Sequence, residues 1–269
     1  MPELPEVETT RSGIEPHLVG QAIADLVIRN GSLRWPVPDE IHDLVDQKVI
    51  AVRRRAKYLL VDFETGTLIL HLGMSGSLRI SSADTPLRKH DHLQFMLGSG
   101  AELRFHDPRR FGCALWSTDP EQHDLIRNLG PEPLEPEFSV EHLLAACSQR
   151  KAPIKQVIMD GKVVVGVGNI YACEALHRSG IHPKRPAQRI SKARLAKLVE
   201  EIRFVLERSI TQGGTTLRDF VNESGEAGYF KQQLTVYGRE SEPCHTCCTP
   251  IKRLVLGQRS TFYCPKCQR

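Results

Sequence analysis

The first eight residues, Met1-Pro2-Glu3-Leu4-Pro5-Glu6-Val7-Glu8, contain a potential amine nucleophile with an acid beside it. Removal of the initiator methionine before the small residue Pro2 leaves a free secondary amine, and an α-amino group has a pKa of about 7.7 to 8.0. Such an amine is partly unprotonated at neutral pH, so it can attack a carbonyl or a sugar C1′ and form an iminium. Glu3 is placed to move the proton. An ordinary helix start is the alternative interpretation.

The same residues predict the element that positions this amine. Proline suits the first turn of a helix, and Glu6 favours the positive end of the helix dipole. A mostly apolar stripe at helical spacing follows, formed by Leu4, Val7, Arg11, Ile14 and Leu18. We therefore expect Pro2 to lie just before a helix that ends near Gly20.

Four cysteines near the end of the chain have the spacing of a metal site. They form two Cys-x2-Cys pairs separated by sixteen residues, Cys244 with Cys247 and Cys264 with Cys267. Four thiolates at this spacing fit one tetrahedral Zn²⁺, and an all-cysteine set leaves no open position for catalysis. The sequence therefore predicts a structural zinc that stiffens a β-hairpin carrying Arg253 and, near its tip, Arg259. Cys248 is a less suitable ligand, because Cys247 completes the paired spacing.

Residues 166–169, Gly-Val-Gly-Asn, lead directly into a predicted helix. A tight turn into a helix N-terminus presents backbone N–H groups to an anion, with Asn169 as cap or direct donor and Lys151 and Lys155 just upstream. A simple capped helix explains the segment equally well. The glycine spacing is not a dinucleotide fingerprint, so no nucleotide cofactor is expected.

Further candidate binding residues occur outside these motifs. Residues 53–57, Arg-Arg-Arg-Ala-Lys, are a basic cluster on a strand in which Lys57 needs a groove to act. His90 and His92 lie on one side of a strand; a phosphate or sugar contact by His90 is favoured over a metal site, because no third ligand is near. Five residues lie at turns between strands, namely His71, Met74, Arg109, Arg110 and Phe111. An exposed Met or Phe among them is a candidate for a wedge that enters a base stack, and a core position is the alternative for each.

The remaining pattern predicts an α+β protein. Short strand-like runs alternate with glycines over roughly the first 120 residues, at 22–28, 49–52, 58–63, 67–72, 78–80, 92–97, 102–105 and 113–116. This spacing indicates an antiparallel β-sandwich or flattened barrel. A proline-rich connector spans 118–138. Helices are expected at 141–149, 153–159, 170–178 and 191–212, the last with Ser191 as N-cap, followed by a mobile glycine-rich loop at 213–230.

Composition supports a soluble, cytoplasmic protein. The chain of 269 residues has no apolar run of membrane-spanning length and no secretion signal at its start. Residues 239–269 carry six basic and two acidic side chains, a surplus of four that equals the whole formal net charge of +4. A basic module on a nearly neutral body suits a polyanion such as nucleic acid. The three scattered cysteines, Cys113, Cys147 and Cys173, are expected in the core.

Taken together, these motifs resemble those of the formamidopyrimidine-DNA glycosylases. The N-terminal Pro-Glu-Leu-Pro-Glu-Val-Glu, the strand with Lys57, residues 71–76 (His-Leu-Gly-Met-Ser-Gly), residues 107–112 (Asp-Pro-Arg-Arg-Phe-Gly), residues 165–171 (Val-Gly-Val-Gly-Asn-Ile-Tyr) and the cysteine finger match in order. The resemblance implies three parts: a catalytic helix with a β-sandwich at 1–130, a helix-two-turn-helix unit with a lesion lid at 131–230, and a zinc finger at 235–269.

The resemblance also implies an activity. A bacterial, monomeric base-excision enzyme removes oxidised purines, chiefly 8-oxoguanine and formamidopyrimidines, from duplex DNA and then cleaves the strand by β,δ-elimination. Pro2 attacks C1′ to form a Schiff base, Glu3 assists as proton donor, and Lys57 and Arg259 serve the eliminations. The matched DNA-binding positions are His71, Met74, His90, Arg109, Phe111, Arg150, Lys151, Lys155 and Asn169; of these, Met74, Arg109 and Phe111 fill the gap left by the extruded base.

Three alternatives compete with this interpretation. An endonuclease VIII-type enzyme removes oxidised pyrimidines with the same proline, but its members typically have glycine where Leu4 stands. A non-catalytic DNA-damage binder is expected to lack the Pro2-Glu3 pair. A zinc-ribbon protein of translation or transcription explains only the tail. Lesion preference is the least specified property, since the lid sequence at 222–226 varies in the family, and Cys248 stands where many members have glycine.

Overall fold

The computed structural model describes residues 2–213 and 234–269. Within these residues the chain forms two compact units, one of residues 2–127 and one of residues 128–211 with 234–269. None of the helices in these two ranges has the length and apolarity needed to cross a membrane. The lid predicted at 213–230 lies outside the described residues except for Gly213.

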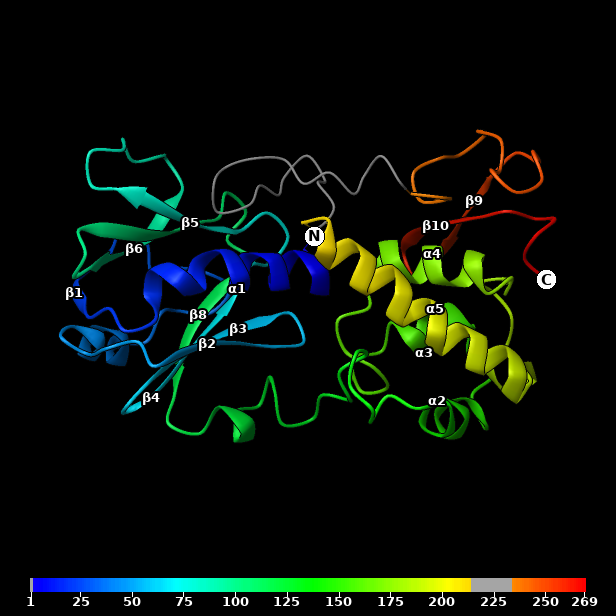
Figure 1. Ribbon diagram of the computed structural model, residues 1–269, viewed down its shortest axis with the longest axis horizontal. Coiled ribbons are helices and arrows are strands. Elements are labelled where there is room, and N and C mark those ends of the chain that lie inside the picture. The colour runs from blue at the N-terminus through cyan, green and yellow to red at the C-terminus, as the bar shows by residue number, and fades with distance from the viewer. Residues whose placement is uncertain (1, 214–233) are drawn as a thin grey trace. The chain divides into compact units, whose positions relative to one another are not determined.

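Two antiparallel four-stranded sheets form the body of the first unit (Figure 1). One has the order β1-β6-β7-β5 and the other the order β2-β3-β4-β8. The strands are β1 (Ile23–Ile28), β2 (Ala51–Arg55), β3 (Tyr58–Phe63), β4 (Gly66–His71), β5 (Ser77–Ser82), β6 (Asp91–Leu97), β7 (Ala101–His106) and β8 (Cys113–Ser117). Their inward side chains share one apolar core, which confirms the predicted sandwich.

Helix α1 (Leu4–Leu18) packs against this sandwich and contacts β2 of one sheet and β5 of the other (Figure 1). The predicted stripe explains the packing, because Leu4, Val7, Ile14 and Leu18 are all buried. Arg11 is the exception: it lies at the edge of the stripe and pairs with Glu8 and Glu15. The start of α1 is therefore fixed relative to both sheets.

Short 3-10 helices interrupt the loops of this unit. The first, η1 (Asp39–Leu44), follows Pro38, and η2 (Pro120–Gln122) lies in the proline-rich connector. Helix η1 was not predicted, because six residues with two buried side chains, Ile41 and Leu44, leave too short a periodic pattern to recognise.

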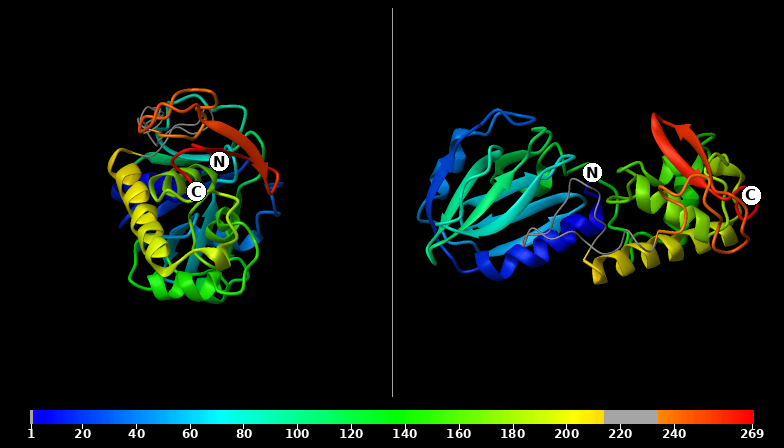
Figure 2. Two further views of the ribbon diagram at one scale, coloured as in Figure 1. Left: turned by 90° about the vertical axis from the view of Figure 1, so that its right-hand side faces the viewer. Right: turned by 90° about the horizontal axis from the view of Figure 1, so that it is seen from above.

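The second unit is helical, with α2 (Val140–Cys147), α3 (Ile154–Ile158), α4 (Asn169–Arg178), the 3-10 helix η3 (Ala187–Arg189) and α5 (Lys192–Thr211). Helix α5, yellow in Figure 2, packs against α4 and α2, and its buried stripe is the predicted one, including Leu195, Leu198 and Ile202. Ser191 directly precedes α5, and its carbonyl accepts from the N–H of Leu195 at 3.0 Å. Gly213, just beyond the helix, has a φ of +75°.

A two-stranded hairpin completes this unit. Strands β9 (Lys252–Leu256) and β10 (Arg259–Tyr263) pair antiparallel around Gly257 and Gln258. Both turn residues have positive φ, 55° and 61°, as a two-residue hairpin turn of the primed type requires. The prediction that Arg259 lies at the tip is confirmed, since it is the first residue after this turn. The scattered cysteines Cys113, Cys147 and Cys173 are buried, as expected.

Candidate functional site

The beginning of α1 is a tightly bonded helix start. Glu3 is the N-cap in extended conformation, and its N–H donates to Glu6 Oε2 at 2.8 Å in a capping box. Pro2, Glu3 and Glu6 are all buried, the two carboxylates at only 2% exposure. The predicted pair of Pro2 and Glu3 therefore lies at one fixed point directly before the helix.

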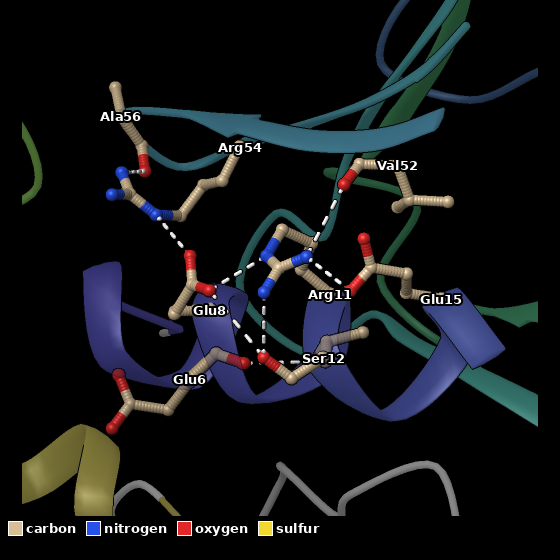
Figure 3. Close-up of polar contacts among 9 residues, drawn as sticks. Glu6, Glu8, Arg11, Ser12, Glu15, Val52, Arg54 and Ala56 are labelled. Carbon is tan, nitrogen blue, oxygen red and sulfur yellow. Dashed lines mark hydrogen bonds and ion pairs between the residues drawn. The ribbon is translucent and has the colours of Figure 1, made fainter. Parts of the chain in front are cut away.

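A network of charges ties α1 to the turn that carries Lys57 (Figure 3). Arg54 on β2 donates from Nε to Glu8 Oε2 at 2.8 Å and from Nη1 to the carbonyl of Ala56 at 3.0 Å. Glu8 also accepts from Arg11 Nε at 2.7 Å. Burial acts to raise the pKa of Glu8, but the hydrogen bonds and charges of Arg11 and Arg54 outweigh it and hold this pKa below its usual value.

Lys57 itself lies in the turn between β2 and β3, not on a strand as expected. Ala56, just before it, has a φ of +54°, which an alanine adopts only at a cost of about 1 to 2 kcal/mol. The bond from Arg54 to the Ala56 carbonyl holds this conformation. Sequence reasoning missed this function of Arg54 because Glu8 and Arg54 are 46 residues apart in the chain.

His71, at the end of β4, is close to this turn. Its ring packs at a tilt of 47° against the Tyr58 ring, with centroids 4.9 Å apart, and its Nδ1 accepts from the N–H of Gly73 at 2.9 Å. Burial, followed by the positive charges of Lys57 and Arg34, lowers the pKa of His71 to about 4. His71 is therefore neutral at physiological pH, and its remaining proton is on Nε2.

Met74 and Phe111 line one cleft. Its volume is about 550 Å³, and Arg34, His71, Gly73 and Arg110 complete its lining. Both apolar side chains are exposed, at 36% and 44%, and the Arg109 guanidinium lies over the Phe111 ring with its Cζ 4.8 Å from the centroid. The three residues predicted to fill the gap left by an extruded base therefore lie together in an exposed group.

Two features hold the loops of this cleft. At Gly73 the backbone approaches the neighbouring loop so closely that an added Cβ would meet Gly112 N at 2.4 Å. The fully buried Asp107 accepts from Ser75 Oγ at 2.9 Å and from the N–H of Gly112 at 2.8 Å. In the sequence, Asp107 stands out only as the first residue of the motif at 107–112. A buried acid that organises two loops leaves no periodic signal by which to recognise it.

His90 lies on a second cavity of about 610 Å³ that is lined by several basic side chains, among them Arg29, Arg88 and Lys89. Its ring centroid is 5.9 Å from that of His92, but His92 is buried and its Nε2 is 2.8 Å from the carbonyl oxygen of Asp107. Among the described residues, only the four cysteines form a cluster suited to a metal ion. The surroundings of His90 therefore suit an anion.

In the second unit, Lys155 and Asn169 form one bonded group. Lys155 on α3 is 1% exposed, and its Nζ donates to Asn169 Oδ1 at 2.5 Å and to Thr261 Oγ1 at 2.7 Å. Asn169 donates from Nδ2 to the carbonyl of Ser260 at 2.9 Å. Of the two roles predicted for Asn169, helix cap or direct anion donor, the cap is wrong: Gly168 is the N-cap, and the Asn169 side chain instead fastens the hairpin to the helix.

The other predicted basic residues of this unit are exposed. Arg150 pairs with Asp160 at 3.0 Å in a bridge about 40% exposed on both sides, Lys151 follows it, and Arg259 stands at the hairpin tip. Surface pairs of this kind contribute little to stability, about 0 to 1 kcal/mol, so these charges are available to a partner.

The four predicted cysteines converge on one site. The sulfur atoms of Cys244, Cys247, Cys264 and Cys267 all lie within 4.8 Å of one another. Zn–S bonds of about 2.3 Å in a tetrahedron place sulfurs about 3.8 Å apart, so the donor set and its spacing fit one Zn²⁺. Cys248 is exposed, outside the cluster, and has a φ of +60°. The site is structural, since all four positions are thiolates.

Comparisons with known proteins match the chain along its length. Three family models match: the formamidopyrimidine-DNA glycosylase N-terminal domain at 1–114, the formamidopyrimidine-DNA glycosylase H2TH domain at 129–221, and a zinc finger found in FPG and IleRS at 241–269. A formamidopyrimidine-DNA glycosylase of Enterobacter sp. (strain 638) is 56% identical over 269 residues, all of both chains.

Solved structures give the same result. The crystal structure of the MutM (Fpg) protein from Thermus thermophilus superposes with a TM-score of 0.89 at 35% identity, covering 99% of this chain and 98% of that one. The Lactococcus lactis Fpg, in complex with DNA containing an abasic site, superposes with a TM-score of 0.92 at 29% identity, covering 99% of each chain.

Proposed function

The chain belongs to the formamidopyrimidine-DNA glycosylase family, and on that premise we propose which of its residues carry the reaction and on which lesions it acts. The protein is a DNA glycosylase of base-excision repair that acts on damaged DNA, and it contains one structural zinc. The proposal concerns oxidised purines, chiefly 8-oxoguanine and formamidopyrimidines, and cleavage of the strand after base removal.

Pro2 is the nucleophile of the proposal. After loss of Met1, the lone pair of its amine attacks C1′ of the damaged nucleotide, and the base leaves with the electrons of the glycosidic bond and takes up a proton. Opening of the sugar ring, assisted by Glu3 as proton donor, gives the iminium. The observation that carries this assignment is the fixed, capped start of α1, where Pro2 and the buried Glu3 are adjacent.

Strand cleavage follows from the iminium. Loss of a C2′ proton expels the 3′-phosphate by cleavage of the C3′–O bond, and a second elimination breaks the C5′–O bond. Lys57 and Arg259 are assigned to these eliminations, as proton donors or by neutralising phosphate charge. Their local surroundings support the assignment: Lys57 lies on a turn fastened to α1, and Arg259 is the exposed first residue of β10.

The remaining assignments concern DNA binding. Met74, Arg109 and Phe111 fill the space of the extruded base, as their exposed grouping at one cleft suits. His71 and His90 contact the strand beside them. In the second unit, Arg150 and Lys151 supply phosphate contacts, and Lys155 and Asn169 present the N-terminus of α4 and the hairpin.

We also propose how the chain divides into domains and where in the cell the protein acts. The catalytic part spans 1–130, the helix-two-turn-helix part with the lid 131–230, and the zinc finger 235–269; the three family matches have similar bounds. The protein acts as a monomer in the bacterial cytoplasm, on the DNA of the nucleoid.

Lesion specificity is tested with two duplexes that differ only in the damaged base, 8-oxoguanine opposite cytosine and thymine glycol opposite adenine. Single-turnover excision on each separates purine from pyrimidine preference, and Glu3→Gln is the control for the chemistry. Faster excision of 8-oxoguanine supports the proposal. A preference for thymine glycol assigns the chain to the endonuclease VIII-type activity instead, and binding to either duplex without excision points to a damage-binding protein.

A further inference from the structure

Helix α4 holds the zinc module by a row of side chains on one face. Asn169, Glu174 and His177 all contact residues of the segment 234–269. Cys173, on the same face, is part of the small apolar core that surrounds the metal site, together with Val236, Cys244, Ile251 and Cys264. The helix is therefore the structural base of the zinc module.

Glu174 fixes the segment that leads into the module. Its carboxylate is 3% exposed and accepts from three consecutive backbone N–H groups, those of Thr235, Val236 and Tyr237, at 2.8, 3.0 and 2.9 Å. It also accepts from the hydroxyl of Thr235 at 2.5 Å. Bonds of this kind to a charged group contribute about 1.5 to 3 kcal/mol each, so the segment 235–237 is firmly ordered.

His177, one turn further along α4, connects this segment to the metal site. Its Nδ1 lies 3.2 Å from Thr235 Oγ1, and its Nε2 lies 3.6 Å from Cys244 Sγ. The imidazole is 8% exposed, so the two contacts fix its orientation. A zinc-bound thiolate can only accept a hydrogen bond, so the Nε2 that faces Cys244 is the donor in the metal-loaded protein.

We propose that His177 is a positioning residue of the zinc site, whose Nε2–H donates to the Cys244 thiolate and slows loss of the metal. Four thiolates around one Zn²⁺ carry a net negative charge, and a donated hydrogen bond disperses part of it. Outer-shell partners of metal ligands typically change metal affinity by about 10- to 100-fold.

A cavity next to the zinc site is lined in part by His177. A cavity of about 400 Å³ lies beside the cysteines, and His177, Thr235, Thr246 and Cys267 are among its lining residues. A chelator or a proton can therefore approach Cys267 from this side. His177 forms part of the same wall, and its Nε2 faces the buried Cys244 behind it.

The test compares two replacements of His177 in the full-length zinc protein. His177→Phe keeps an aromatic ring of similar size but has no donor, whereas His177→Gln keeps an amide N–H near the place of Nε2. His182→Phe is the matched control, because His182 also packs on the module, 4.7 Å from the Tyr263 ring centroid, without a hydrogen bond to a cysteine in the part of the chain that the structure describes.

Two readouts are used, neither of which depends on enzyme activity. The first is the rate of zinc transfer to 4-(2-pyridylazo)resorcinol, and the second is the thiolate-to-metal charge-transfer band of the cobalt-substituted protein. We expect His177→Phe to lose zinc about 10- to 100-fold faster and to shift the band, and His177→Gln and His182→Phe to stay near the unmodified protein.

Two results overturn the proposal. One is an unchanged release rate and cobalt spectrum in His177→Phe. The other is equal acceleration in His177→Gln and His177→Phe, which assigns the effect to packing of the imidazole and not to its donor. If His177→Phe folds poorly, His177→Leu, which fills part of the same space and also has no donor, takes its place in the comparison with His177→Gln.

Discussion

Replacement of Arg54 by alanine tests how the N-terminal helix and the Lys57 turn are joined. Arg54 bonds Glu8 at 2.8 Å and the Ala56 carbonyl at 3.0 Å, and the side chains of Arg54 and Glu8 are only 12% and 19% exposed. A charge-assisted bond between such partly buried groups is worth about 1.5 to 3 kcal/mol, and the bond to the carbonyl about 1 kcal/mol. Glu8 keeps Arg11 as a partner, so we expect Arg54→Ala to fold with a loss of about 2 to 3 kcal/mol in unfolding free energy.

We expect Arg54→Ala to slow strand cleavage more than it slows base excision. Without the bond to the Ala56 carbonyl, the left-handed conformation of the turn is no longer held, and Lys57 moves with the turn. Misplacement of a reacting group by about 1 Å costs up to about 100-fold in rate. We therefore expect strand cleavage at a preformed abasic site to slow by about 10- to 100-fold. The change in excision of 8-oxoguanine should be smaller, because Glu3, which directly follows Pro2, is held by a separate capping box with Glu6.

Arg53→Ala is the matched control. Arg53 is the neighbouring residue on the same strand, but it is 46% exposed, pairs with Asp62 and Glu121, and has no bond to Ala56 among the contacts of the described residues. Its loss should cost about 0.2 to 1 kcal/mol and leave both rates unchanged. Denaturant unfolding and single-turnover gel assays measure the two quantities. Equal behaviour of Arg53→Ala and Arg54→Ala in both assays refutes the reasoning.

Three further predictions concern the acid response, the loops of the cleft and the metal. Unfolded histidine takes up a proton near pH 6.5, but folded His71 does so only near pH 4, so the contribution of His71 to stability is full above pH 6.5 and is lost as the pH falls toward 4. His71→Gln should therefore flatten the plot of unfolding free energy against pH between these values. An NMR titration of His71 with a midpoint near 6.5 contradicts this prediction. Asp107→Asn keeps the size of the side chain but replaces one of the two oxygens that accept from Ser75 and Gly112 by a donor. We expect a loss of about 1 to 3 kcal/mol in unfolding free energy and weaker binding to DNA with an abasic site. Unchanged thermal unfolding contradicts this prediction. Metal analysis should find one zinc ion per chain. Removal of the zinc by a chelator should weaken duplex binding at least about tenfold, because residues 234–269 have only a small apolar core of their own. Full binding by the zinc-free protein argues against a structural ion.

The sequence predicted those features that depend on local periodicity or on fixed spacing. The eight strands of the sandwich, the stripe of α5 and the zinc ligands belong to this group, because alternation, a 3.6-residue period and Cys-x2-Cys each record their structure within a few neighbouring residues. The N-terminal helix belongs to it as well. The assignments of Lys57 and Arg259 to the eliminations rest on family resemblance.

What the sequence did not predict depends on contacts between distant residues. The Arg54 bond to Glu8 spans 46 positions, the Lys155 bond to Thr261 spans 106, and the His177 contact with Cys244 spans 67. Asn169 illustrates the limit. Its position at a helix start suggested a cap, but the side-chain oxygen that a cap would use accepts from Lys155 Nζ at 2.5 Å, and the amide nitrogen donates to the carbonyl of Ser260 at 2.9 Å. Tertiary packing decides which of two satisfactory partners a polar side chain bonds.

The central claim is that Pro2 forms the covalent intermediate, and intact-mass analysis with borohydride trapping tests it most directly. The purified chain is weighed before and after reaction with sodium borohydride and a duplex containing one 8-oxoguanine opposite cytosine. The account predicts a chain that lacks Met1 and, after trapping, a DNA adduct that maps to Pro2. A processed N-terminus without an adduct, on this duplex and on one with an oxidised pyrimidine, or an adduct that maps to a lysine, contradicts it.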